Sequence, residues 1–169
     1  MVMRCIICIF MLSIPLFAAE MRGLVVAISD GDTIKVLDAQ KVQHKIRLDA
    51  IDAPETGQAF GTQSKRYLSN LASGRNVRIV YSGTDRYGRI LGTVFIGGRN
   101  INLMLVEAGY AWHYVQFAPD RREFTEAEAR ARKARKGLWA DAVPPIPPWD
   151  YRKAKQPKQK EEHYIHVNP

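Results

Sequence analysis

The sequence predicts a mainly β fold with added helices (α+β), organised as a small β-barrel. Two β-rich runs flank Asp30-Gly31, a pair of residues that is a strong signal for a tight turn between strands. Between residues 42 and 50, apolar and charged residues alternate with the period of a half-buried strand. Apolar residues at helical spacing occur in segments that lie between and after the strands. Short strands with inserted helices favour a barrel with helical additions.

Five segments are predicted as strands, and each of them is short. Pro54 follows the third segment and ends it, because the residue before a proline stays extended. A connection over 82–89 joins the last two segments and has the composition of a hairpin loop. The five segments are 23–28, 33–37, 42–50, 77–81 and 90–96.

Three segments are predicted as helices: 59–72, a short helix that runs to Glu107, and 120–136. Asn100 or Asn102 is placed to cap the short helix. The last helix is acidic in its first half and basic in its second half, an order that complements the helix dipole. An OB-type barrel is one architecture that combines such strands and helices, and it commonly binds oligonucleotides.

Length and composition indicate one soluble domain with a sizeable core. The chain has 169 residues, of which 46% are hydrophobic and 25% charged, values that exclude wholesale disorder. The formal net charge is +8, which favours nucleic acid or an anionic membrane surface as a partner over an acidic metabolite. A basic charge that only keeps the protein soluble is the alternative. We expect a monomer.

The first nineteen residues have the organisation of a secretory signal peptide. A single basic residue, Arg4, precedes the apolar run 5–17, and the small pair Ala18-Ala19 follows it. The run is shorter than the roughly 20 residues that span a bilayer. We therefore expect export to the periplasm or the medium, with no stable membrane partner once segment 1–19 is cleaved. An uncleaved leader that anchors the protein is the alternative. Both cysteines lie within this leader.

The other end of the chain changes character after Trp139. Residues 143–149 are rich in proline, so they are predicted to be extended rather than helical. Polar sequence continues to Pro169 and is typical of disorder, which makes 143–169 a tail and 22–142 the folded domain. His163 and His166 have helical spacing that suits a metal, but a polar tail explains them better.

Three short segments contain side chains suited to metal and phosphate chemistry. In 30–33, two carboxylates stand two residues apart beside the predicted turn, where they can face a hard cation. In 47–56, Asp52 and Glu55 flank a rigid Ala-Pro step that limits how far they can separate. The third segment, 85–89, carries two arginines and a tyrosine in a hairpin connection. Each segment alone also fits an ordinary turn, but the three together favour a catalytic site.

With these motifs the chain resembles the staphylococcal nuclease family, from about Gly23 to Trp139. The resemblance implies a five-stranded OB-fold barrel with about three helices. It also implies a hydrolase, a calcium-dependent endonuclease that cleaves phosphodiester bonds in DNA and RNA and leaves 3′-phosphate ends. With the leader, we expect a secreted nuclease with little sequence specificity. A non-catalytic OB-fold module that only binds nucleic acid is the alternative. Such a module would gain nothing from three acidic groups beside a phosphate.

The resemblance implies a role for each candidate site residue. Asp32 and Asp52 are the expected calcium carboxylates, and the backbone carbonyl of Ala53 is a further expected ligand. Glu55 is the expected general base that activates water. Phosphate is expected to bind Arg47 and Arg89, and the nucleotide is expected to contact Arg86 and Tyr87.

General chemistry supports these residue types independently. Attack on a phosphodiester adds negative charge to the phosphorus oxygens, which fixed cations stabilise. Calcium supplies part of that positive charge as a Lewis acid. Arginine suits the rest, because its planar fork matches phosphate oxygens. A carboxylate base typically contributes about 10²–10⁴-fold to the rate.

Several features depart from the family pattern or need structural help. The loop 56–59 is shorter than its counterpart, which leaves substrate preference open. A late pair of tyrosines in the family has no clean match, although Tyr114 is a candidate. Arg47 and Asp52 are five positions apart, so a regular strand would put them on opposite faces. A bulge or bend between them is required if both serve one site.

Overall fold

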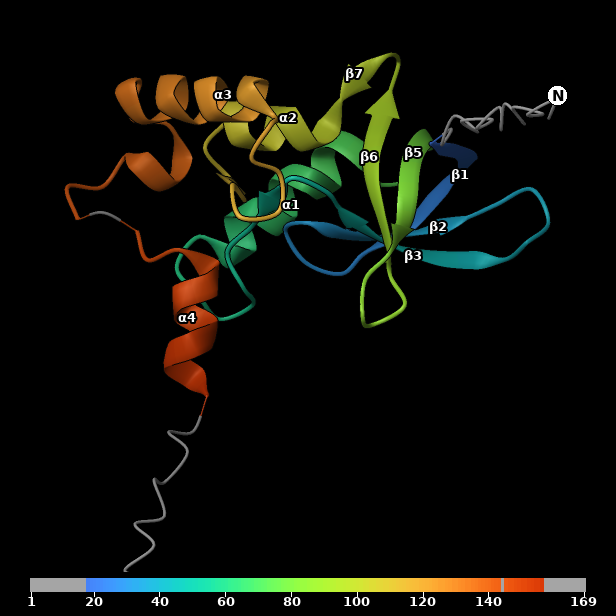
Figure 1. The fold of residues 1–169 in the computed structure, drawn as a ribbon, viewed down its shortest axis with the longest axis horizontal. Coiled ribbons are helices and arrows are strands. Elements are labelled where there is room, and N and C mark those ends of the chain that lie inside the picture. The colour runs from blue at the N-terminus through green and yellow to red at the C-terminus, as the bar shows by residue number, and fades with distance from the viewer. Residues whose placement is uncertain (1–17, 144, 157–169) are drawn as a thin grey trace, which may run out of the picture.

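The computed structural model describes residues 18–143 and 145–156 and shows a closed barrel of five strands (Figure 1). Within the barrel, the strand pairs β1–β2, β2–β3, β1–β5 and β5–β6 are antiparallel, and the parallel pair β3–β6 closes the ring. This arrangement confirms the predicted OB-type α+β fold. The strands are β1 (Ala19–Ile28), β2 (Thr33–Leu37), β3 (Gln43–Leu48), β5 (Asn76–Thr84) and β6 (Ile90–Ile96), and the short β7 (Arg99–Asn100) extends the sheet beyond β6.

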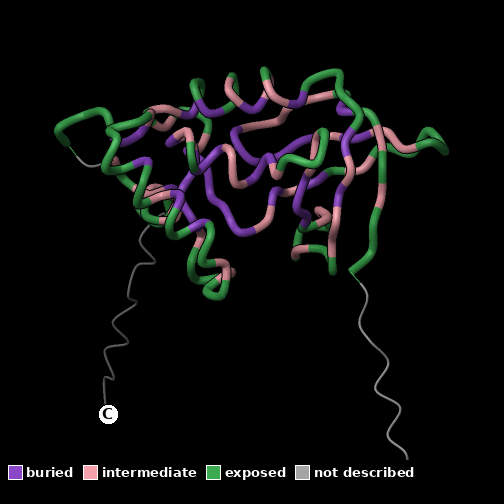
Figure 2. Tube along the Cα trace, turned by 90° about the horizontal axis from the view of Figure 1, so that it is seen from above, coloured by how far each residue is buried: buried purple, intermediate pink, exposed green. Residues whose placement is uncertain are grey.

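The barrel interior is filled by the apolar positions that the strand patterns indicate. In β3, Ile46 and Leu48 are fully buried in the barrel, whereas Lys45, on the other face of the strand, is exposed. Ile34 and Val36 of β2 and apolar residues of β1, β5 and β6 complete the same core. Figure 2 shows the buried stretches running through the middle of the molecule. Burying these side chains supplies most of the driving force for folding.

Three helices cover one end of the barrel, as expected. They are α1 (Gly61–Ala72), α2 (Ile101–Glu107) and α3 (Arg122–Lys133), and α2 contacts both α1 and α3. The side chain of Asn100 caps α2 by accepting a hydrogen bond of 3.1 Å from the backbone N–H of Leu103. A 3-10 turn, η1 (Gly137–Trp139), follows α3. Trp112 and Trp139 are buried in a second apolar cluster, which confirms their interpretation as packing residues.

A fourth helix, α4 (Pro148–Lys155), corrects the prediction for the tail. We predicted an extended segment over 143–149 and disorder over the rest of 143–169, and this is wrong for 148–155. Pro148 is the first helical residue, where a missing N–H has no partner to lose, and no proline follows it in the helix. Figure 1 shows α4 set apart from α2 and α3, beside the loop that precedes α1.

Two sequence predictions fall on parts of the chain that the structure does not describe. The predicted leader lies largely within 1–17, and His163 and His166 lie within 157–169. None of the helices within 18–143 and 145–156 has the length and apolar character needed to cross a membrane.

Candidate active site

The site is built where the chain leaves the barrel at the end of β3. Ala50 adopts a positive φ of 60°, and the chain then enters β4 (Ile51–Asp52), which pairs with β8 (Trp112–His113). This is the bend that Arg47 and Asp52 require if both serve one site. A buried amide, Asn102, holds the bend by donating to the backbone oxygen of Asp49 at 3.0 Å and to its carboxylate Oδ1 at 2.7 Å.

Arg47 lies between two buried carboxylates. Its Nη2 is 2.8 Å from Oδ1 of Asp52 and 3.1 Å from Oδ2 of Asp32. Its Nη1 donates to the backbone oxygens of Leu48 at 2.6 Å and Ile51 at 2.9 Å. The side chain of Arg47 is only 11% exposed. One carboxylate oxygen of each of these two aspartates therefore lies against the same nitrogen, Nη2 of Arg47.

Asp32 lies at the end of the β1–β2 turn and is buried. Its Oδ2 accepts a hydrogen bond of 2.8 Å from the backbone N–H of Ala53, and its Oδ1 accepts one of 3.1 Å from Thr33. Burial raises the pKa of Asp32 to about 7, although the Arg47 guanidinium opposes the shift. The turn can lie this close to Ala53 and to α1 because Gly31 has no side chain; a Cβ there would collide with Ser64.

Asp52 and Glu55 share a second arginine that the sequence did not assign to the site. Arg152, from α4, donates from Nη2 to Oδ2 of Asp52 at 2.7 Å and from Nη1 to Oδ1 at 3.2 Å. The same Nη1 also donates to Oε1 of Glu55. Burial opposes the charge of Arg152, but these two acidic partners outweigh it and raise the pKa of the guanidinium. Arg152 lies within the predicted tail 143–169, and no motif marks it.

The remaining candidates lie in the turn between β5 and β6. Asp85 organises this turn, since its Oδ1 accepts from the backbone N–H groups of Tyr87 at 2.9 Å and Arg89 at 3.0 Å. Its Oδ2 accepts from Nε of Arg89 at 2.7 Å. Tyr87 is 70% exposed, and the guanidinium carbons of Arg86 and Arg89 lie 5.3 and 5.4 Å from its ring centre. These side chains form a separate group from the one around Arg47.

The strand register relates the two groups. Arg47 pairs with Leu91 in the parallel β3–β6 ladder, and Arg89 precedes Leu91 by two residues. Arg89 itself lies in the turn, one residue before β6 begins at Ile90, so the ladder brings this turn to the strand next to β3. The barrel thus places the carboxylate site and the basic turn on adjacent strands.

Comparison with known proteins decides the family. The staphylococcal nuclease homologue family matches residues 45–141, a range within the predicted domain 22–142. The chain belongs to the staphylococcal nuclease family. Membership confirms the resemblance and the prediction of a nuclease-type hydrolase.

Individual relatives of this family are similar over most of their length. An uncharacterized endonuclease of Escherichia coli is 43% identical over 148 residues, covering 87% of this chain and 95% of the relative. A micrococcal nuclease of Shigella flexneri is 40% identical, with 86% of this chain and 88% of the relative covered. An uncharacterized endonuclease of Haemophilus influenzae is 45% identical, with 76% and 71% covered.

The oxygen atoms at the site of this staphylococcal nuclease family member are of the kind that bind calcium. Calcium prefers hard oxygen ligands in a flexible arrangement, and Asp32 and Asp52 both direct carboxylate oxygens at the point that Nη2 of Arg47 reaches. Across 18–143 and 145–156, no three His, Cys, Asp or Glu side chains gather as a metal cluster. The two carboxylates would therefore need backbone carbonyl or water oxygens to complete a calcium site.

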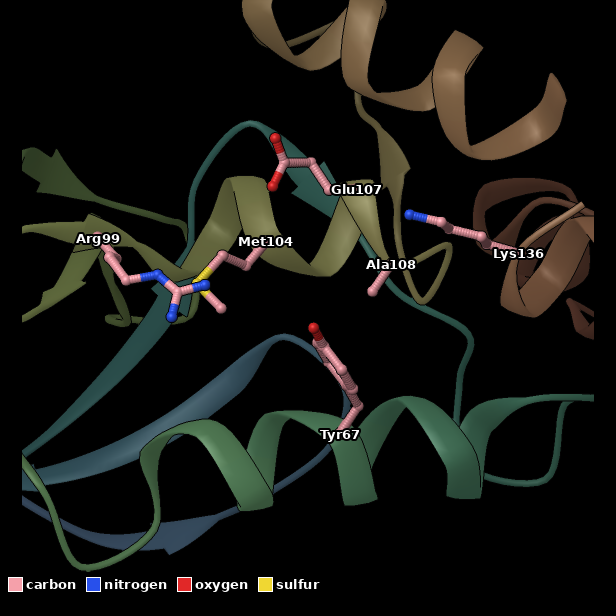
Figure 3. Close-up of a pocket in the computed structure, with 6 residues that line it drawn as sticks. All are labelled: Tyr67, Arg99, Met104, Glu107, Ala108 and Lys136. Atoms are coloured by element: carbon pink, nitrogen blue, oxygen red, sulfur yellow. The ribbon is translucent and has the colours of Figure 1, made fainter. Parts of the chain in front are cut away.

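A surface pocket lies elsewhere and contains none of the candidate site residues. Tyr67 of α1, Arg99 of β7 and Glu107 of α2 help to line it, as Figure 3 shows. Burial raises the pKa of Tyr67. The pocket mixes cationic and acidic side chains, such as Arg99 and Glu107.

Proposed function

We propose that this protein is a calcium-dependent endonuclease that hydrolyses phosphodiester bonds in DNA and RNA with little sequence specificity. The observation that carries the proposal is the convergence of Asp32, Asp52 and Glu55 around cationic groups at the open end of β3. A domain that only binds nucleic acid would be weakened by three carboxylates beside a phosphate. An enzyme needs them, to hold a metal and to accept a proton.

The arginines are assigned to charge stabilisation. Negative charge builds on the phosphorus oxygens as water attacks, and preorganised cations lower the energy of that transition state. Arg47 is held by four acceptors in a fixed position, which favours this role. Arg89 lies in the turn that leads into the adjacent strand β6, and its planar guanidinium matches the geometry of phosphate oxygens. We propose that both bind the scissile phosphate.

Glu55 is assigned as the general base. It is the least buried of the three carboxylates, with 37% of its side chain exposed, so water can reach it. The proton of the attacking water passes to the Glu55 carboxylate while the new bond from oxygen to phosphorus forms. The bond from phosphorus to the 5′ oxygen then breaks, and that oxygen takes a proton from solvent, which leaves a 3′-phosphate end.

Calcium is the proposed cofactor, held by Asp32, Asp52 and the backbone carbonyl of Ala53. When bound, it supplies Lewis-acid polarisation of a phosphate oxygen. Ala53 is also fixed to Asp32 through its backbone N–H, which ties two of the proposed ligands together.

Substrate contact and location complete the proposal. Arg86 and the exposed ring of Tyr87 are proposed to contact the nucleotide from the β5–β6 turn, and the net charge of +8 attracts the polyanion. We propose that the protein is exported by leader 1–19 and acts as a monomer. Cleavage after Ala19 would remove only the first residue of β1.

Digestion of single-stranded DNA, double-stranded DNA and RNA by the chain from Glu20 onward tests the proposal. We expect cleavage in calcium, none in excess chelator, and 3′-phosphate ends. Asp52→Asn should raise the calcium concentration required for half-maximal cleavage. Salt-sensitive binding of nucleic acid without cleavage in any divalent metal would instead support the non-catalytic OB-fold module.

A further inference from the structure

Helix α4 delivers a cation into the candidate active site from a distant part of the sequence. Arg152 is 100 residues from Asp52 and 97 from Glu55, yet it donates hydrogen bonds to both carboxylates. Both oxygens of Asp52 accept from Arg152, and Oδ1 also accepts from Arg47. Because the carboxylate of Asp52 is almost fully buried, it has little room for a further partner while Arg152 stays.

Contacts outside the carboxylates also hold α4 in this position. The hydroxyl of Tyr151 donates to the backbone oxygen of Gly57 at 3.0 Å. The amide of Gln58 donates to the backbone oxygen of Ile146 at 2.6 Å, just before the helix. The ring of Trp149 stacks on Tyr114 with 5.3 Å between ring centres and an angle of 3°. The helix is therefore docked on the loop that carries Glu55, and its contacts do not depend on Arg152 alone.

This docked state opposes the proposed reaction in two ways. Calcium and Arg152 would bind the same carboxylate oxygens of Asp52, so they would compete. The Oε1 oxygen of Glu55 also accepts a hydrogen bond from Arg152, so Arg152 occupies an oxygen that the proposed base would offer to water while α4 is docked.

We propose that α4 is an autoinhibitory strap and that Arg152 is a positioning residue that competes with calcium for Asp52. This inference rests on the proposed calcium site. In the docked state Arg152 pairs with both Asp52 and Glu55; calcium ligation by Asp52 would release Arg152, and the helix would separate from the loop 56–59. Substrate phosphate then has access to a site whose base is free.

Linkage makes the proposal quantitative. If docking of α4 weakens calcium binding by some factor, calcium must weaken docking by the same factor. Couplings of this kind are typically about 5–150-fold. Complete undocking should therefore tighten calcium binding at least about fivefold, and partial undocking by less.

Calorimetric titration of calcium into four proteins tests the competition without measuring activity. Arg152→Gln should bind calcium at least about fivefold more tightly than the wild-type chain. Tyr151→Phe keeps the Arg152 charge but loses the bond to Gly57, and it should also bind calcium more tightly, by a smaller factor. Lys153→Gln removes the same charge from a 76% exposed position on α4 and should leave the affinity within twofold.

Quenching of tryptophan fluorescence by acrylamide reports whether α4 is docked. Calcium should increase quenching in the wild-type chain, and Trp149→Phe should abolish that increase. Calcium binding by the wild-type chain with the same affinity in Arg152→Gln would overturn the strap and leave the proposed function intact. Weaker calcium binding in Arg152→Gln would also overturn it, because Arg152 would then assist the metal site. Failure of every protein to bind calcium would overturn both proposals.

Discussion

Arg47 and Asp52 are joined across the β3–β4 turn by a hydrogen bond of 2.8 Å from Nη2 to Oδ1. Along a regular strand these residues would face opposite sides. Ala50, with its φ of 60°, redirects the chain so that both side chains meet. The reaction proposed here depends on this turn, because it brings an arginine of the barrel wall to a carboxylate outside the barrel.

Asn102→Ala should destabilise the fold and disturb the site together. The Asn102 amide donates to Asp49 and to the backbone oxygen of Gly92, and it accepts from the backbone N–H of Val94 at 3.1 Å. Each buried group left without a partner costs about 1–3 kcal/mol. Urea denaturation should show at least that loss, and nuclease activity should fall.

Asn100→Ala is the matched control for this substitution. It removes the N-terminal cap of the same helix and should cost about 1 kcal/mol. Nuclease activity should be retained, because Asn100 does not contact the turn. Equal activity losses in both variants would contradict a specific role of Asn102 in holding the turn.

The sequence predicted most strands of the barrel but not the hydrogen bonds that Asn102 makes around the β3–β4 turn. Alternating Ile46 and Leu48 marked β3, and the Asp30-Gly31 turn marked the β1–β2 connection, because both patterns are local. Asn102 was one of two candidate caps. Only the folded chain shows that Asn100 caps α2, whereas Asn102 points inward to Asp49. A buried polar contact between distant segments has no periodic signal.

Arg47→Gln should lower the free energy of unfolding, and calcium should restore part of that loss. Removing one partner of a buried ion pair typically costs about 3–5 kcal/mol, since the remaining charge loses its compensation. Asp32 would be left in that state without metal, whereas Asp52 would keep its ion pair with Arg152. Urea denaturation should show a large loss in chelator and a smaller one in calcium. The same loss in both conditions would argue against a metal at these carboxylates.

The β5–β6 turn should depend on acid pH through Asp85. Burial raises the pKa of Asp85, but hydrogen bonds from Arg89 and Tyr87 outweigh it, so the folded pKa lies below the ordinary 3.8. The ionised form is therefore the one that the fold favours. Its stabilisation is complete above about pH 3.8 and is lost as the pH falls through the lower, folded pKa.

Nuclear magnetic resonance checks this pH dependence directly. The amide shifts of Tyr87 and Arg89 should titrate below pH 3.8 in the wild-type chain. Asp85→Asn should abolish that titration and leave the turn less ordered at neutral pH. Shifts of these two amides that titrate unchanged in Asp85→Asn would assign the transition to another group.

Gly61→Ala should lower activity more than stability. The first residue of α1 lies against the backbone of Glu55, and a Cβ at position 61 would collide with the Glu55 carbonyl. The loop that carries the proposed base would have to move. Gly83→Ala is the control, because a Cβ there meets no atom within 4 Å. Comparable kcat/KM values for the two variants would show that the position of this loop is unimportant.

The contact of Arg152 with the candidate site could not be predicted from local sequence patterns. Proline-rich composition over 143–149 favoured a tail, yet Pro148 starts α4, and the helix reaches Asp52 across 100 residues. Asp32, Asp52 and Glu55 were identified because short motifs carry them. Arg152 lies in no motif, and its partners become neighbours only when the loop 56–59 and α4 pack together.

Single-turnover cleavage of DNA by Glu55→Gln in saturating calcium tests the central claim most directly. The substitution keeps the size of the side chain but removes the proton acceptor, so we expect a rate loss of about 10²–10⁴-fold with unchanged DNA binding. Glu126→Gln, a 69% exposed glutamate on α3, should cleave at the wild-type rate. A Glu55→Gln protein that cleaves as fast as the Glu126→Gln control would contradict the proposed active site.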